Sequence, residues 1–143
     1  PDIDIIVYHS GFDVGPAEGA YDEANNFGVD RLITSMRTSG IEPGGNVFGE
    51  LGSTWRFVMS KPTEAAHVIG KLLKEAKEVV NAGDPDREGQ LLVDEVLEHF
   101  RNSKPVRRFW VSAQDSVSVK RGLAALKENL ERSSPSPPNS RQT

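Results

Sequence analysis

The sequence predicts a small α/β fold, with a short and mostly parallel sheet of about four strands and helices packed on it. Short β-branched runs alternate with longer amphipathic segments along the chain. Strands that alternate with helices pair in parallel through right-handed crossovers. A chain of 143 residues is also long enough for one domain with a hydrophobic core.

The first half of the chain contains two strand candidates on either side of a helix. Residues 3–8 form a nearly continuous apolar run that is typical of a buried strand, and residues 46–51 are a second, shorter candidate. Residues 29–39 repeat apolar side chains at helical spacing and precede a glycine. Residues 13–28 are rich in Gly, Asp, Glu and Asn without periodicity, which predicts a long surface loop.

A longer helix is predicted to begin near residue 60. Ser60 is an N-cap candidate, and Pro62 falls in the first turn, where its missing N–H costs nothing. Apolar residues then recur at spacings of three and four through Ala76, which predicts an amphipathic helix.

The remaining elements continue the alternation. We expect a strand at 78–82, an amphipathic helix whose apolar residues run from Leu91 and Leu92 to Phe100, a strand at 106–112 and a last helix at 117–130. In α/β folds the ligand site lies beyond the carboxyl ends of the strands. Both His9 and the acidic segment after Ala82 fall at predicted strand ends of this kind.

The most informative segment is the acidic loop that follows the strand at 78–82. Asp84, Asp86 and Glu88 alternate with Pro85 and Arg87 immediately before a helical stretch. Magnesium is usually held by one or two protein carboxylates, waters and the phosphate oxygens of a substrate, and Arg87 could contact a phosphate. The alternative is an acidic helix N-terminus that only caps the helix. Spacing alone leaves both interpretations open.

Charge and composition limit the possible partners. Residues 1–60 contain nine acidic and three basic residues, whereas residues 61–143 contain twelve acidic and fourteen basic residues. Only the second half can therefore face a polyanion, if its basic side chains gather on one side. No apolar run is long enough to span a membrane, and no signal-peptide pattern opens the chain. The absence of cysteine is compatible with a reducing cytoplasm, where we expect the protein.

The acidic loop also carries a family resemblance. The run from Ala82 to Leu97, Ala-Gly-Asp-Pro-Asp-Arg-Glu-Gly-Gln-Leu-Leu-Val-Asp-Glu-Val-Leu, closely resembles the signature of the Toprim domain in type IA DNA topoisomerases. The resemblance covers residues 63–130 and implies a Toprim-like, Rossmann-like fold. It implies a Mg²⁺ site at Asp84, Asp86 and Glu88, with Glu88 also assisting catalysis. It further implies cleavage and rejoining of single-stranded DNA, for which we expect DNA contacts from Arg87, Arg107 and Arg108.

Two parts of the topoisomerase chemistry are not found where the resemblance would place them. The Toprim domain normally begins with a strand that ends in Glu-Lys-Pro-Ser, and here Ser60 precedes Lys61 and Pro62. The nucleophilic tyrosine is also missing, because Tyr8 and Tyr21 both precede the resembling segment. We therefore expect a module that is incomplete on its own. Since the first residue is proline, we also expect a processed or excised piece.

Residues 1–74 resemble a different family, the amidohydrolase-related TIM-barrel hydrolases. The resemblance rests on residues 4–12, 46–55 and 64–73 and implies a metal or catalytic role for His9. The chain then divides into a hydrolase-like segment at 1–62, a Toprim-like segment at 63–132 and a disordered Pro/Ser tail at 133–143, as in a chimera. Two alternatives to the topoisomerase-related module follow: a fragment of a metal-dependent amidohydrolase, and a folded remnant without activity.

Overall fold

The computed structural model describes residues 3–52, 60–113 and 115–129. The chain divides into two compact units, Pro1–Glu78 and Val79–Thr143, and each has its own small sheet. The predicted class, α/β with short parallel strands and packed helices, is confirmed. The predicted boundary between residues 62 and 63 stays a prediction, and the predicted tail at 133–143 lies outside the described residues.

The first unit is built as strand, helix, strand, helix. Its elements are β1 (Ile5–Val7), the 3₁₀ turn η1 (Tyr8–Gly11), α1 (Gly28–Thr38), β2 (Val47–Gly49) and α3 (Pro62–Glu75). The two strands pair in parallel, with Ile5 opposite Val47 and Val7 opposite Gly49. Strands that run in parallel need a crossover, and α1 lies in the connection between them.

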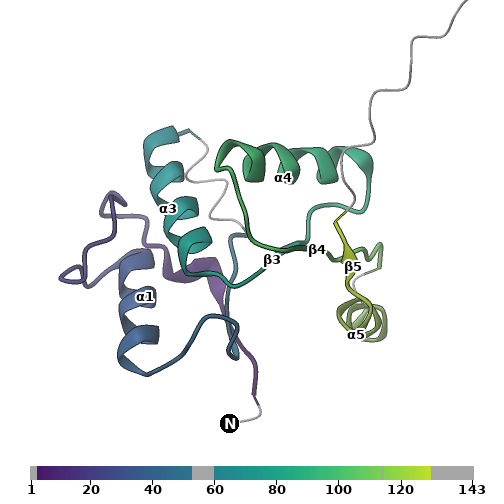
Figure 1. Ribbon diagram of the computed structural model, residues 1–143, viewed down its shortest axis with the longest axis horizontal. Helices are drawn as coiled ribbons and strands as arrows, with labels where there is room; N and C mark the ends of the chain where they lie inside the picture. The colour runs from purple at the N-terminus through teal and green to yellow at the C-terminus, as the bar shows by residue number, and fades with distance from the viewer. Residues whose placement is uncertain (1–2, 53–59, 114, 130–143) are drawn as a thin grey trace, which may run out of the picture. The chain divides into compact units, whose positions relative to one another are not determined.

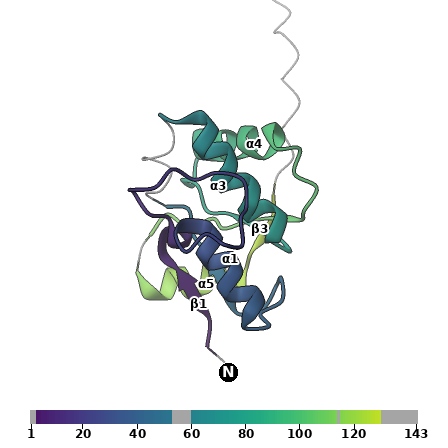
Figure 2. The same cartoon turned by 90° about the vertical axis from the view of Figure 1, so that its left-hand side faces the viewer.

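The core of the first unit lies between its two helices. Val29 and Ile33 of α1 pack against Ala65 and Val68 of α3, and Figure 2 shows these two helices side by side. The four residues are the apolar stripes that the helical spacing predicts. The packed helices thus form the hydrophobic layer of this unit.

A buried ionic network ties the 13–28 segment to these helices. The Lys71 Nζ atom donates to Glu18 Oε2 at 2.5 Å and to Asp30 Oδ1 at 2.6 Å, and all three side chains are buried. Burial by itself would raise the pKa of Asp30, but hydrogen bonds from Lys71 and Asn25 outweigh it and the pKa is lowered. Glu18 lies within the predicted surface loop, so this loop supplies a buried charge instead of staying wholly on the surface.

The predicted N-cap of α3 is wrong. Lys61, and not Ser60, occupies the N-cap position, and its side chain makes no capping hydrogen bond. Pro62 at the first helical position confirms the other half of that prediction. Lys61 instead forms an ion pair with Glu64 at 3.1 Å, one turn into the helix.

The second unit is a three-stranded sheet with one helix on each side (Figure 1). Its elements are β3 (Val79–Asn81), α4 (Arg87–His99), β4 (Val106–Arg108), α5 (Ser116–Ala124) and β5 (Lys127–Glu128). β3 and β4 run in parallel through the α4 crossover, and β5 pairs antiparallel with β4. At Gly122 of α5 an added Cβ would lie 2.8 Å from the Phe109 ring, so a side chain there would prevent this close packing.

Two predictions for this unit are wrong in detail. The last helix ends at Ala124 instead of residue 130, and residues 127–128 pair with β4 as β5. Leu91 and Leu92, predicted to face inward, are 42% and 58% exposed. The small residue Gly89 takes the buried place on α4, so the buried face of the helix is rotated away from both leucines. Within the described part of the chain, no helix is long and apolar enough to cross a membrane.

Candidate metal centre

The acidic loop follows the carboxyl end of β3 and leads directly into α4. Asp84, Asp86, Arg87 and Glu88 are all exposed. Asp86 is the N-cap of α4, and its Oδ1 accepts a hydrogen bond from the Gly89 N–H at 2.7 Å. Asp86 therefore caps α4, and both interpretations of the loop allow this contact. The cap engages one oxygen of this carboxylate, and exposure leaves the loop carboxylates open to a cation from solvent.

The buried Arg108 side chain holds the backbone of this loop through hydrogen bonds. Its side chain is only 1% exposed, and its guanidinium donates to the carbonyl oxygens of Asn81 at 3.0 Å, Gly83 at 2.8 Å and Asp84 at 2.5 Å. It also donates to Asn81 Oδ1 at 3.0 Å. Asn81 and Arg108 are directly opposite each other in the β3–β4 register. Arg108 therefore holds the loop through its backbone carbonyl oxygens and not through its carboxylates.

The positive charge of Arg108 also affects the electrostatics of the loop carboxylates. Burial lowers the pKa of the Arg108 guanidinium, and the nearby carboxylates of Asp94, Asp86 and Asp84 act in the opposite direction. A buried cation thus lies close to the two loop aspartates and offsets part of their mutual repulsion.

Gly89 allows the helix to touch the loop. A Cβ at this position would lie 2.5 Å from the Asp84 carbonyl oxygen and 2.6 Å from the Asp84 nitrogen. Because these are backbone atoms, they could not turn aside as a flexible side chain could. The direct contact between α4 and the loop thus requires glycine at position 89.

The carboxylates of the acidic loop suit a divalent cation that takes only one or two protein ligands. Among residues 3–52, 60–113 and 115–129, no group of three or more His, Cys, Asp or Glu side chains is arranged to hold a metal. Mg²⁺ does not require such a cage, since it keeps several waters and takes one or two carboxylates together with substrate phosphates. Asp84 and Asp86 supply that number, and Glu88 in the first turn of α4 is a third exposed carboxylate nearby in sequence.

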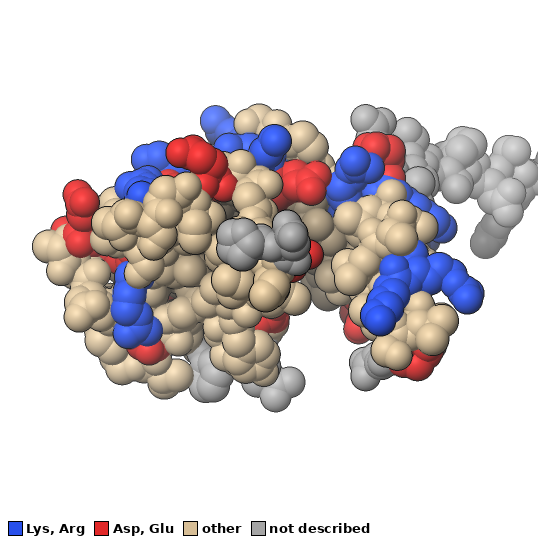
Figure 3. All heavy atoms as spheres, turned by 90° about the horizontal axis from the view of Figure 1, so that it is seen from below, with Lys and Arg blue, Asp and Glu red and all other residues tan. Residues whose placement is uncertain are grey.

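The basic side chains that were expected to contact DNA lie in different environments. Arg87 is exposed at the first position of α4. The Arg107 side chain is 42% exposed and forms an ion pair with Glu128 at 3.5 Å, whereas Arg108 is buried against the loop. Figure 3 shows basic and acidic side chains interspersed on the face that it draws. Arg87 and Arg107 thus stay accessible to a polyanion, whereas Arg108 donates its hydrogen bonds to the loop backbone.

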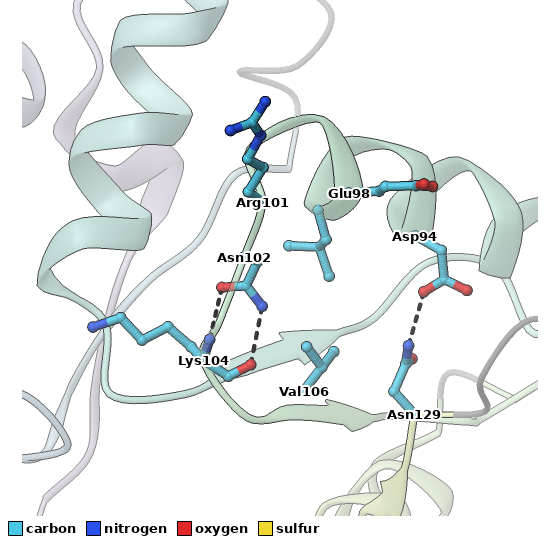
Figure 4. A pocket seen from close by; sticks show the side chains of 8 residues that line it. Asp94, Glu98, Arg101, Asn102, Lys104, Val106 and Asn129 are labelled. Atoms are coloured by element: carbon cyan, nitrogen blue, oxygen red, sulfur yellow. Dashed lines mark hydrogen bonds between the residues drawn. The ribbon is translucent and has the colours of Figure 1, made fainter.

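A separate hollow of about 520 Å³ lies away from the acidic loop (Figure 4). It is lined by the last turns of α4, by the segment that leads into β4 and by Asn129, beyond β5. Asn102 joins to Lys104 through two hydrogen bonds, and Asn129 Nδ2 donates to Asp94 Oδ1 at 2.8 Å. Because its walls lie toward the amino end of β4, the hollow is at the other end of this unit from the loop.

His9 lies at the carboxyl end of β1 and contacts Glu50, which follows β2. The His9 N–H donates to Glu50 Oε2 at 3.0 Å, and His9 Nδ1 lies 3.7 Å from the same oxygen. His9 and Ser10 adopt left-handed φ angles of 54° and 49°, which are uncommon for residues with a side chain. One histidine and one glutamate are fewer than the three protein ligands of a catalytic zinc site.

The chain matches a known protein family over most of its length. A family model described as the Toprim domain matches residues 8–113. The chain belongs to the Toprim domain family. The match runs from η1 through β4 and contains the whole acidic loop, so the assignment of the loop to a Toprim domain no longer depends on its short motif alone.

Individual relatives match about half of the chain. DNA topoisomerase 3 of Vibrio cholerae is 48% identical over 68 residues, which is 45% of this chain and 10% of the relative. DNA topoisomerase 3 of Salmonella typhimurium is 41% identical over 71 residues, which is 47% of this chain and 11% of the relative. The same enzyme of Staphylococcus haemolyticus is 32% identical over 76 residues. The chain thus corresponds to about a tenth of the length of these curated relatives.

The amidohydrolase resemblance of residues 1–74 finds no support in these comparisons. The Toprim match begins at residue 8 and runs through most of that segment, so neither a chimera nor a hydrolase role for His9 is supported. The match also places Ser60, Lys61 and Pro62 well inside the Toprim domain instead of at its start. The expectation that Ser60 replaces a glutamate at the beginning of the domain therefore loses its basis.

Proposed function

We propose that this Toprim domain binds Mg²⁺ and serves single-strand DNA cleavage and rejoining of the type IA topoisomerase kind. The observation that carries the proposal is the pair of exposed aspartates, Asp84 and Asp86, on a loop whose backbone is held by the buried Arg108. The similarity to DNA topoisomerase 3 of several bacteria supports the choice of DNA as substrate.

The proposal assigns a role to each accessible side chain of the loop. Asp84 and Asp86 would hold Mg²⁺, with Glu88 as a further ligand or as a group that transfers a proton to the reacting oxygen. Mg²⁺ bound there would neutralise charge on a phosphodiester and orient its oxygens. Arg87 at the start of α4 and Arg107 would hold neighbouring phosphates, because both side chains are accessible.

The nucleophile is proposed to come from outside this chain. The two tyrosines, Tyr8 and Tyr21, both belong to the first unit, and the Tyr21 hydroxyl is hydrogen bonded to Thr34 Oγ1 at 3.0 Å. The Toprim domain would then supply the metal and the phosphate contacts, and a second segment would supply the attacking hydroxyl. On this basis the isolated chain is expected to bind Mg²⁺ and DNA without relaxing supercoiled DNA.

Calorimetric titration with Mg²⁺ tests the metal assignment. The Asp84→Asn/Asp86→Asn double variant should lose binding, because amide oxygens carry no charge. Asn also remains a good N-cap, so α4 should keep its first turn in the variant. Glu95→Gln is the matched control, because Glu95 is an exposed carboxylate on the same helix. Equal Mg²⁺ affinity of the parent and the double variant would refute the assignment.

A further inference from the structure

Trp110 is an exposed aromatic side chain beside the acidic loop. It lies two residues beyond β4 and is 41% exposed. One face of its indole contacts the Arg108 guanidinium, whose Cζ is 4.8 Å from the ring centroid. A cation over the face of a tryptophan is an attractive arrangement, so this contact fixes the orientation of the ring while part of the ring stays open to solvent.

The same guanidinium joins the indole to the loop. Arg108 Nη2 donates to the Asp84 carbonyl oxygen at 2.5 Å, and Arg108 Nη1 donates to Gly83 and Phe109 carbonyl oxygens. The Phe109 N–H in turn donates to the Asn81 carbonyl oxygen at 2.9 Å and continues the ladder between β3 and β4. Trp110 and Asp84 therefore follow neighbouring strands at the same edge of the sheet and share one buried cation.

We propose that Trp110 is a stacking platform for one unpaired base of single-stranded DNA. This inference rests on the proposed function for its choice of ligand. An exposed, oriented indole offers a flat π-face, and stacking of bases on such faces is tolerant of sequence because every base has one. A base stacked there would bring the phosphate that follows it toward the acidic loop and the exposed Arg87.

Unpaired DNA is favoured over duplex DNA by the chemistry of the platform. The faces of bases within a duplex are already stacked on their neighbours, and freeing one of them costs unpairing and unstacking. The accessible basic residues of this unit, Arg87 and Arg107, can attract a phosphate backbone but carry no base preference. Stacking by Trp110 thus supplies the distinction between single strands and duplex that phosphate contacts alone would lack.

Tryptophan fluorescence tests the proposal on the whole 143-residue chain. In a Trp55→Phe background Trp110 is the one tryptophan that remains, so its quenching reports directly on stacking. The chain is titrated, in the presence of EDTA, with an oligodeoxythymidylate and with an abasic strand of the same length. We expect quenching and tighter binding with the thymidylate, and no quenching with the abasic strand.

Variants of Trp110 give a second readout. By anisotropy of the labelled thymidylate, Trp110→Leu should weaken binding by roughly 5- to 100-fold, as expected for the loss of one base–aromatic stack. Trp110→Phe should lose less because it keeps a ring. Both variants should bind the abasic strand as the parent does. Equal affinity of the parent for thymidylate and abasic strands, or no quenching by thymidylate, would overturn the proposal.

The failure of this inference and that of the proposed function are distinguishable. Because EDTA removes divalent cations, quenching by thymidylate does not depend on the metal site. Loss of Mg²⁺ binding without loss of quenching would refute the metal assignment alone. Normal Mg²⁺ binding with no difference between thymidylate and abasic strands would overturn the stacking platform alone.

Discussion

Replacing Arg108 by methionine is the sharpest test of how the acidic loop is held. The substitution removes four hydrogen bonds to backbone carbonyl oxygens, at 2.5 to 3.3 Å, and one to Asn81 Oδ1. Methionine keeps much of the apolar volume and cannot donate. The loop carbonyls would lose their donor in a partly buried place, which is the costly side of hydrogen-bond loss.

The magnitude follows from opposing effects. A hydrogen bond that involves a charged group contributes about 1.5 to 3 kcal/mol, but burial of the guanidinium itself costs several kcal/mol. Arg108 Nε is buried and has no hydrogen-bond acceptor among the described residues, which reduces the net gain further. We expect Arg108→Met to lower the free energy of unfolding by about 3 kcal/mol, toward the lower end for breaking a buried ionic interaction.

Urea denaturation followed by far-UV circular dichroism measures this change. With a slope of about 1.5 kcal/mol per molar urea, the midpoint for the second unit should fall by about 2 M. Arg107→Met is the matched control on the adjacent position of β4, where the exposed ion pair with Glu128 contributes less than about 1 kcal/mol. Equal midpoints for the two variants would refute the reasoning.

Three further predictions concern residues with close contacts in the structure: Gly89, Lys71 and Asp30. Gly89→Ala should destabilise the second unit and shift the NMR signals of the loop, because the new methyl meets the backbone of Asp84. Lys71→Met should lower the free energy of unfolding by about 3 to 5 kcal/mol in urea denaturation, because Glu18 and Asp30 would stay buried without their cation. The pKa of Asp30 is lowered in the folded state, so its contribution to stability is present above the unfolded pKa of about 3.9 and is lost as pH falls through the folded value. Denaturation midpoints measured from pH 7 to pH 3 should therefore fall less steeply for Asp30→Asn than for the parent.

Each of these predictions has a control and an outcome that contradicts it. Gly15→Ala adds a methyl where nothing lies within 4 Å, and it should leave the loop signals unchanged. Lys74→Met removes a lysine from the exposed face of the same helix as Lys71. If Lys74→Met destabilised the chain as much as Lys71→Met, the buried network would not be the cause. Parallel pH profiles for Asp30→Asn and the parent would contradict the titration argument.

Periodicity and local chemistry predicted the elements well where each segment is governed by its own sequence. The helix expected at 29–39, the helix expected from near residue 60 to Ala76 and the acidic loop after the strand at 78–82 lie within a residue or two of where the pattern placed them. Residues 127–128 were predicted as helix because their local preference is helical, but pairing with β4 overrides it. Such pairing depends on a partner about twenty residues away and leaves no periodic signal.

The candidate site was predicted in its exposed part and missed in its buried part. The carboxylates could be found from their spacing, whereas Arg108 was expected to contact DNA as one of a basic pair. Alternation along a strand places Arg107 and Arg108 on opposite faces, so one of the two had to point inward. That signal was available in the sequence, but the carbonyl oxygens that receive the guanidinium carry no sequence signature at all. The pairing of Lys71 with Glu18 and Asp30 was equally invisible, since these residues lie 53 and 41 positions apart.

The attachment of Arg108 to carbonyl oxygens separates the shape of the loop from its chemistry. Every peptide unit presents the same carbonyl group whatever side chain it bears. The hydrogen bonds from Arg108 would therefore hold a loop of quite different charge in the same conformation. Mutations at Asp84, or replacement of Asp86 by another residue that caps α4, can then alter ligand preference while the chain keeps its fold. Natural variation could exchange one reactive group for another on this loop at little cost to folding, which is the property that makes a scaffold reusable.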